Sequence, residues 1–182
     1  MPPPLRLLRA RIASPVGELT LLGEGARLVA IGFEGYGERA LAQLAAGLGE
    51  GEVEVEDVPD PAGAASALAR YFDGELDAPR SVAVDPAGTP FQKRVWETLR
   101  HIPPGTTISY GDLALRIGQP TASRAVAQAC GKNPVPIVVP CHRVLGSDGL
   151  LVGYAGGLMV KARLLAHEKA RPAAVESGDL FD

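Results

Sequence analysis

The chain has 182 residues, 46% of them hydrophobic, and a formal net charge of −3. This length fits one domain or two small domains that share an interface, with enough apolar residues for a core. No apolar run approaches the roughly 20 residues that a membrane span needs, and residues 1–15 lack the continuous apolar core of a signal peptide. Because the cysteines are Cys130 and Cys141 alone, a disulfide framework is excluded and a cytoplasmic protein is expected.

Charge is divided unevenly along the chain. Residues 1–90 carry 7 Lys or Arg against 14 Asp or Glu, whereas residues 91–171 carry 11 against 4, and residues 172–182 add three acids. A basic second half is typical of a segment that meets a polyanion. Chance segregation of solvated charges is the alternative, and the charges alone do not decide between the two.

The first half of the chain predicts a mixed α/β unit. Short β-rich runs, separated by Gly-containing turns, predict antiparallel strands over residues 5–14, 17–25 and 27–35. Helical patterns that stop at Gly cover residues 38–49 and 62–74. Between these helices, residues 51–61 alternate acids with Val, as a one-sided strand or an extended linker would. Residues 80–88 predict a final strand, which Pro86 and Gly88 interrupt.

After Gly88 the pattern becomes helical. Thr89 is a suitable N-cap and Pro90 suits the first turn of a helix. The apolar face of this helix comprises Phe91, Val95, Leu99 and Ile102. A Gln-Pro pair joins two further short helices, expected over residues 109–118 and 121–133. This order is the outline of a helix-turn-helix, although many helical hairpins share it.

The helix expected over residues 121–133 has an unusual outward face. At about 100° per residue, the inward face should comprise Ala125, Val126, Ala129 and Cys130. The outward stripe should consist of Ser123, Ala127 and Gly131, flanked by Arg124, Gln128 and Lys132. Small residues let a helix backbone approach its partner closely, which fits a DNA minor groove better than a major groove. Packing against another helix is the alternative, and the basic flanks favour DNA.

A candidate nucleophile follows the apolar run that leads to residue 140. The prolines of this run predict an extended path into the interior, which ends at Cys141. A thiolate is the reactive form, and burial raises the pKa of a cysteine, so a base must lie close by. His142 is the neighbouring base. Adjacent side chains of an extended chain point in opposite directions, so His142 can serve Cys141 only if the backbone turns or a water molecule bridges them.

A third group is needed to orient the imidazole, as in a catalytic triad. The candidate is Glu168, which ends a helical run and follows Leu164 and Leu165 on the same face. An acid on a leucine face is costly unless it is paired. Each residue also has a purely structural interpretation: Cys141 as a core residue, His142 as a satisfied interior histidine, and Glu168 as a surface acid near a helix end.

The motif PCHRV at residues 140–144 favours the chemical interpretation. It lies within GKNPVPIVVPCHRV and is followed by GYAGGLMVKARLLAHE, and FQKRVWETLRHIPPGTTISYGDLA and SRAVAQAC stand upstream of it. On these motifs the chain resembles the O6-alkylguanine-DNA alkyltransferases, a family of direct-reversal DNA repair proteins. The match is dense from Phe91 to Glu168 and thin before it.

The resemblance implies an α+β fold in two domains. Residues 1–88 would form an RNase-H-like α/β domain with a supporting role, and residues 89–171 a mostly helical catalytic domain that binds DNA through a helix-turn-helix. Residues 172–182 would form a mobile acidic tail. The implied function is irreversible, single-turnover transfer of an alkyl group from O6 of alkylguanine, or O4 of alkylthymine, in duplex DNA to Cys141 after nucleotide flipping. The protein would act in the cytoplasm, at the nucleoid in a bacterium or archaeon.

The same resemblance gives the catalytic residues their expected roles. His142 would deprotonate Cys141 through a water molecule, and Glu168 would orient His142. Asn133 would brace the turn between the DNA-reading helix and the active-site segment. Tyr110 would act at the flipped nucleotide, near its phosphate and the guanine.

Other residues are expected to contact the DNA and the base. Arg124 would fill the duplex where the damaged guanine flips out, beside the stripe of Ser123, Ala127 and Gly131. Val144 would hold the base through its backbone N–H. Tyr154, with Ala155 and Gly156 of the Gly-rich loop, would form the wall of the pocket. Lys161 matches a lysine that the family carries near the active site.

Two departures from the family pattern concern ligands. Some members carry a Ser where this chain has Ala155, which removes one possible side-chain hydrogen bond to the base, although the backbone N–H remains. Some members bind zinc through Cys and His of the N-terminal domain, whereas residues 1–90 contain neither. No metal and no cofactor are therefore expected. The expected partner is double-stranded DNA that contains O6-alkylguanine, bound in its minor groove by a monomer.

Three other functions are open on the sequence alone. An alkyltransferase-like protein binds the lesion without accepting the alkyl group, but such proteins lack the acceptor cysteine. A helix-turn-helix regulator would need side chains that reach the major groove, which the stripe of small residues does not provide. A cysteine hydrolase would need an oxyanion hole and multiple turnover, which kinetics can test.

Overall fold

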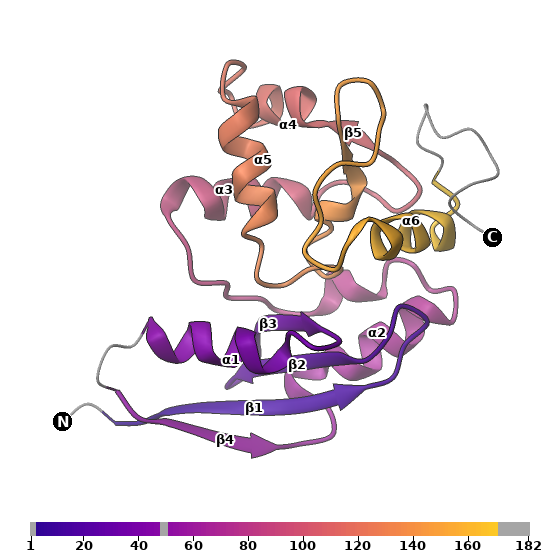
Figure 1. The fold of residues 1–182 in the computed structure, drawn as a ribbon. Coiled ribbons are helices and arrows are strands. Elements are labelled where there is room, and N and C mark those ends of the chain that lie inside the picture. The colour runs from indigo at the N-terminus through magenta and orange to yellow at the C-terminus, as the bar shows by residue number, and fades with distance from the viewer. Residues whose placement is uncertain (1–2, 48–50, 171–182) are drawn as a thin grey trace. The chain divides into compact units, whose positions relative to one another are not determined.

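The computed structural model describes residues 3–47 and 51–170, and the chain divides into two compact units. The first unit comprises residues 1–87, and the second begins at Gly88 (Figure 1). The acidic tail expected at 172–182 lies outside the described residues. No helix in the described part of the chain is both long enough and apolar enough to cross a membrane.

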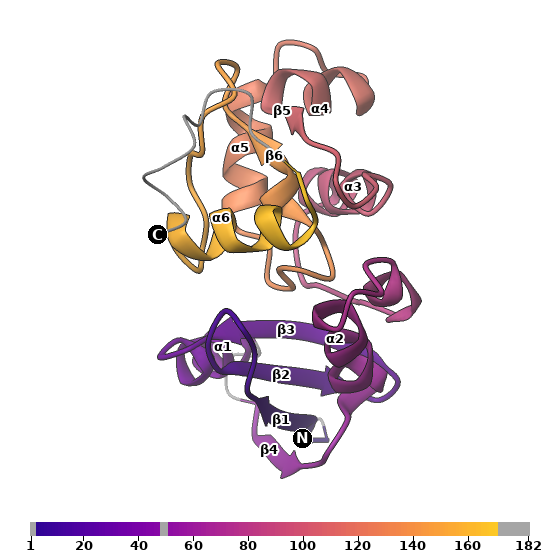
Figure 2. The ribbon, with the colours of Figure 1, turned by 90° about the vertical axis from the view of Figure 1, so that its right-hand side faces the viewer.

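A four-stranded sheet forms the first unit, in the order β3-β2-β1-β4 (Figure 2). Its strands are β1 (Leu5–Ile12), β2 (Leu19–Glu24), β3 (Arg27–Phe33) and β4 (Val53–Asp57). The first three pair antiparallel, as the sequence predicts, and β4 lies parallel to β1. The alternating acidic run is therefore an edge strand rather than a linker. Its charges are exposed and keep this edge polar.

Two helices cover the sheet of the first unit, α1 (Gly37–Ala46) and α2 (Ala64–Phe72). The apolar side of α1 packs on a cluster that includes Leu7, Leu22 and Val29. Helix α1 can begin this close to the sheet because Gly37 has no side chain, and a Cβ there would collide with Thr20. Strand β2 is central and covered, so its residues from Leu19 to Gly23 are all buried.

The strand predicted over residues 80–88 is wrong. Its first residues belong to a short 3-10 helix, η2 (Ala78–Ser81), and the remainder forms a single β-bridge between Val84 and Leu28. The amide of Leu28 donates to Ala83 O at 2.8 Å, and its carbonyl accepts from Asp85 N at 3.0 Å. Pro86 has no N–H, so it cannot extend this pairing. A second 3-10 helix, η1 (Pro61–Gly63), precedes α2.

The second unit is mostly helical, as predicted. Its first helix, α3 (Pro90–Leu99), begins with a complete capping box in which the side chains of Thr89 and Gln92 each bond the other's backbone N–H. The helices α4 (Tyr110–Arg116) and α5 (Ser123–Gly131) follow as a helix-turn-helix. The indole N–H of Trp96 in α3 donates to Ala129 O in α5 at 2.8 Å, which ties the two helices together.

The remaining elements of the second unit carry or adjoin Cys141, His142 and Glu168. They are β5 (Ile108–Ser109), the 3-10 helix η3 (Cys141–Arg143), β6 (Val144–Leu145) and α6 (Leu158–His167). Strands β5 and β6 pair in parallel, so the residue after η3 is fixed beside the start of α4. Leu165 of α6 packs against Leu145 of β6. These contacts bring the two ends of the PCHRV…HE segment together.

Candidate active site

The segment before Cys141 is a compact turn, and the extended path predicted for it is wrong. The N–H of Val139 donates to Val135 O at 2.9 Å, and Ile137 has a φ of 74° although its side chain is β-branched and buried. The prolines of this segment have no N–H, so the segment cannot form a regular strand within a sheet. A β-branched residue at positive φ is strained and persists where the surrounding packing enforces it.

Asn133 closes this turn from inside. Its Oδ1 accepts from Val135 N at 3.0 Å, and its Nδ2 donates to Val139 O at 2.8 Å and to Sγ of Cys141 at 3.2 Å. Asn133 is buried and follows directly after α5. One side chain therefore joins the end of α5, the proline-rich turn and the thiol.

Cys141 is the first residue of η3, so the backbone does turn at the thiol. Its side chain is buried, and burial raises the pKa of the Cys141 thiol. The hydrogen bond from Asn133 and the charge of Lys161 oppose this rise. The site thus keeps the thiol protonated at rest while providing groups that favour the thiolate.

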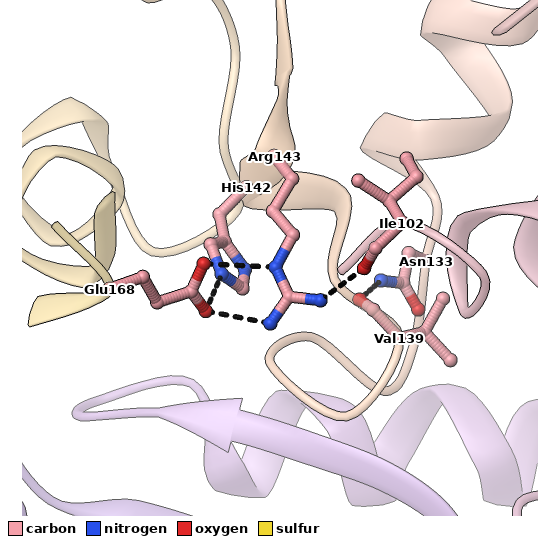
Figure 3. A network of polar contacts seen from close by, with 6 residues as sticks. All are labelled: Ile102, Asn133, Val139, His142, Arg143 and Glu168. Carbon is pink, nitrogen blue, oxygen red and sulfur yellow. Dashed lines mark hydrogen bonds and ion pairs between the residues drawn. The ribbon is translucent and has the colours of Figure 1, made fainter. Parts of the chain in front are cut away.

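Glu168 holds His142 and Arg143 together (Figure 3). It is the C-cap residue of α6 and is almost wholly buried. Its Oε1 lies 2.8 Å from both Nε2 of His142 and Nη2 of Arg143, and its Oε2 lies 2.9 Å from Nε of Arg143. Burial alone would raise the pKa of Glu168, but these hydrogen bonds together hold it well below the usual value of a carboxyl group. The carboxylate is therefore ionised.

The ionised Glu168 determines the tautomer of His142. A carboxylate only accepts hydrogen bonds, so Nε2 of His142 carries the proton of their contact. Burial lowers the pKa of His142, although the bond with Glu168 opposes this, so the neutral imidazole is favoured. Its other nitrogen, Nδ1, is buried and has no hydrogen-bond partner among the described residues. This arrangement leaves Nδ1 as the proton acceptor.

Arg143 lies in the PCHRV motif without an expected role, yet it is central to this cluster. It is 4% exposed, and its Nη1 donates to the carbonyl oxygen of Ile102, which lies just beyond α3. The available signal was an arginine inside an otherwise apolar segment. An acid predicted to need a partner on a leucine face, Glu168, points to the same pairing.

Tyr110 and Lys161 meet at one carbonyl group. Nζ of Lys161 donates to Val152 O at 2.8 Å, and the hydroxyl of Tyr110 donates to the same oxygen at 3.3 Å. Nζ also lies 6.0 Å from the centroid of the Tyr110 ring. Burial lowers the pKa of Lys161 to about 8 and raises that of Tyr110. The predicted pair is thus placed beside the loop that follows β6.

That loop carries the predicted pocket residues. Tyr154 lies edge-on to His142, with 6.5 Å between the ring centroids, and Ala155 is exposed. Gly156 is half-buried, and Gly157 N donates to Tyr154 O at 3.0 Å. Val144 is fully buried, and its N–H donates to Cys141 O within η3. A role for this N–H in holding a base would require that bond to open.

Helix α5 carries the predicted DNA-reading residues. Arg124 is exposed in its first turn, while Ser123 and Ala127 are half-buried and Gly131 is exposed. The inward face is confirmed for Val126, Ala129 and Cys130, but the inward placement of Ala125 is wrong, because Ala125 is exposed. One residue of a helix turns by about 100°, which places Ala125 at the edge of a face centred on Val126.

The geometry brings together the six residues expected at the chemical centre or beside it: Asn133, Cys141, His142, Glu168, Tyr110 and Lys161. No group of three or more His, Cys, Asp or Glu side chains within the described ranges is arranged to hold a metal ion.

Comparison with known families assigns both units. Residues 90–170 match the model "6-O-methylguanine DNA methyltransferase, DNA binding domain", and residues 7–86 match "6-O-methylguanine DNA methyltransferase, ribonuclease-like domain". The chain belongs to the 6-O-methylguanine DNA methyltransferase family. The predicted α+β fold, with a ribonuclease-like unit before a helical DNA-binding unit, is confirmed.

Relatives in this family match along almost their whole length. The methylated-DNA--protein-cysteine methyltransferase of Shigella flexneri is 44% identical over 90% of this chain and 96% of that protein. The protein of the same name from Mycobacterium bovis is 45% identical over 90% of this chain and 93% of its own. A crystal structure of Mycobacterium tuberculosis OGT in complex with DNA has a TM-score of 0.72 at 40% identity, and covers 92% of this chain and 96% of its own.

Proposed function

We propose that this protein repairs alkylated DNA by direct reversal, taking the alkyl group from O6 of an alkylguanine, or O4 of an alkylthymine, onto Sγ of Cys141. The observation that carries the proposal is the buried thiol bonded by Asn133, next to a histidine whose Nδ1 is its available base. The family name and the DNA complex of the Mycobacterium tuberculosis relative support DNA as the substrate.

The proposed reaction uses these groups in sequence. Nδ1 of His142 takes the thiol proton, through a water molecule, while Glu168 holds the ring. The thiolate attacks the alkyl carbon, the C–S bond forms as the C–O6 bond breaks, and the bonding electron pair goes to O6 of guanine. The guanine is then reprotonated. Because water does not hydrolyse a thioether, each molecule reacts once.

DNA recognition is proposed to involve α5. A guanine in duplex DNA must be flipped out of the stack before its O6 reaches a buried thiol. Arg124 is exposed at the start of α5 and can fill the gap, while the small residues beside it allow close approach to the minor groove. Tyr110, Tyr154, Ala155, Gly156 and Lys161 surround the flipped base. We propose that the protein acts as a monomer in the cytoplasm, where Cys130 and Cys141 would stay reduced.

The test is the mass of the intact protein after it is mixed with a duplex that holds one O6-methylguanine. The protein should gain one CH2 group, and an unmodified duplex of the same sequence should leave the mass unchanged. Binding to the methylated duplex without a gain in mass would identify a lesion-binding protein instead. More than one product per protein molecule would identify a hydrolase.

A further inference from the structure

Arg143, which is cationic, and His142, which can become cationic, both contact the carboxylate of Glu168. Arg143 donates to both oxygens of Glu168, at 2.9 and 2.8 Å, and His142 shares Oε1 at 2.8 Å. All three residues are buried, so an uncompensated charge in this cluster would be strongly unfavourable. The protonation states of these three side chains therefore depend on the net charge of the cluster.

With Arg143 present, the cluster is electrically balanced while His142 is neutral. A guanidinium remains charged in proteins, and it cancels the charge of the ionised Glu168. Without Arg143, the buried carboxylate would have His142 as its nearest counter-ion, and an opposite charge at this distance favours the protonated imidazole. An imidazolium has no lone pair and cannot accept a proton from Cys141.

We infer that Arg143 is a positioning residue that keeps His142 a neutral base by cancelling the charge of Glu168. Its bidentate contact with Glu168 and its bond to Ile102 O hold the guanidinium against the carboxylate. The consequence for alkyl transfer rests on the proposed function, whereas the effect on His142 can be measured in the free protein.

The other titratable groups that face His142 come from three elements. Cys141 precedes it in η3, Lys161 acts on it from α6, and the ring of Tyr154 lies beside it from the loop before α6. Burial is the largest cause that lowers the pKa of His142, and the charges of Arg143 and Lys161 add to it against the opposing effect of Glu168. Lys161 donates to the backbone at Val152 O, however, and Arg143 donates to the carboxylate itself.

The experiment compares four proteins: wild type, Arg143→Met, Arg143→Lys, and Arg163→Met as a control at an exposed arginine of α6. NMR titration of the His142 ring in the free protein gives its pKa. Transfer from free O6-benzylguanine, measured against pH, gives the activity without any contribution from DNA binding.

In Arg143→Met the pKa of His142 should rise by about one to three pH units. Its transfer rate should fall relative to wild type at neutral pH and recover toward wild type as the pH is raised, because His142 is neutral above its pKa. Arg143→Lys should regain most of the loss, and Arg163→Met should match wild type. An unchanged His142 pKa, or an equal loss of rate at every pH, would overturn the inference and leave Arg143 a structural role.

Arg143→Met removes the guanidinium that contacts both oxygens of Glu168, and the variant is replaced by Arg143→Met/Glu168→Gln if it does not fold. Because the inference says that the two charges cancel at His142, removing both should leave the His142 pKa within about one pH unit of wild type. A larger change in either direction would contradict it. If the wild type transfers no alkyl group, the proposed function fails, while the NMR titration still decides the role of Arg143.

Discussion

The two units use arginine–carboxylate pairs in opposite ways. In the first unit, Nε of Arg9 lies 2.7 Å from Oδ1 of Asp57, whose side chain is 71% exposed. In the second unit, Nη2 of Arg143 lies 2.8 Å from Oε1 of Glu168, and these two side chains are 5% and 0% exposed. Similar distances therefore occur in very different surroundings. Water screens the first pair, whereas the second pair sets the protonation state of a neighbouring histidine.

The largest effect on activity is expected when the thiol of Cys141 is removed. Cys141→Ala should abolish alkyl transfer and leave binding to alkylated duplex largely intact, because Arg124 stands in the first turn of α5, at the opposite end of the helix from Asn133 and the acceptor thiol. Cys130→Ala is the matched control and should keep transfer, since Cys130 packs as a small hydrophobe on the inward face of α5. Mass spectrometry and a gel-shift assay measure the two properties. Transfer that persists in Cys141→Ala would refute the assignment.

Removing one carboxylate from each unit tests the comparison directly. Glu168→Ala leaves Arg143 buried without its partner and should lower the free energy of unfolding by about 3–5 kcal/mol. Asp57→Ala removes an exposed partner whose charge water already screens, so the free energy of unfolding should stay close to that of the wild type. Urea unfolding of both variants provides the measurement. Equal losses would mean that burial of the Arg143 pair has no energetic consequence.

The same pair makes stability depend on pH. Because the pKa of Glu168 in the folded protein is held below the ordinary value of 4.5, its ionised form stabilises the fold above pH 4.5. This contribution is lost as the pH falls through the folded-state pKa. The stability difference between wild type and Glu168→Ala should therefore shrink in acid, and a difference that stays constant would argue against an ionised Glu168.

Alkylation of Cys141 should have a smaller effect on stability. A thioether adds volume next to the closed turn and weakens the bond from Asn133 to Sγ. Overpacking of this kind typically costs about 1–3 kcal/mol. The methylated protein should melt below the free protein, and the benzylated protein lower still. Because Asn133 joins this turn to α5, both adducts should also hold DNA less tightly. Adducts that melt at or above the free protein would exclude this coupling.

The smallest effect is expected for substitution of Arg124, which tests whether DNA recognition belongs to the second unit and not to the first. Arg124→Ala should slow repair of methylated duplex by about tenfold, which corresponds to about 1.4 kcal/mol. Reaction with free O6-benzylguanine should be unaffected, since a free base needs no flipping. Arg27→Ala, an exposed arginine of the acidic first unit, is the control and should change neither rate. Equal losses on both substrates would give Arg124 a different role.

Local sequence signals predicted much of this fold. Thr89 and Pro90 mark the start of α3 because capping depends on neighbouring residues, and the antiparallel strands follow from Gly-bounded runs. The prolines of the run that leads to Cys141 predict an extended path. The actual turn of this run depends on Asn133 bonds and on the packing of Ile137, which no local pattern encodes. Tertiary contacts also determine the conformation of residues 80–88, which form part of a 3-10 helix and a single β-bridge instead of a strand.

The motifs predict which residues belong to the site. They do not predict the contacts that these residues make with partners distant in the sequence. Glu168 was chosen because an acid on a leucine face needs a partner, and His142 is such a partner. The second partner, Arg143, lies within the PCHRV motif, but arginines are usually solvated and no local pattern indicates that this one is buried. Its burial depends on the approach of α6 and of the carbonyl of Ile102, both remote in sequence.

The central claim is that one thiol, Cys141, accepts the alkyl group once. The most direct measurement is tryptic mapping after reaction with excess O6-methylguanine duplex, because cleavage after Lys132 separates the two cysteines into residues 125–132 and 133–143. We predict one added CH2 group on the peptide 133–143, none on 125–132, and no further product when more duplex is added. Methyl on Cys130, or more repaired guanine in the duplex than protein present, would contradict this assignment.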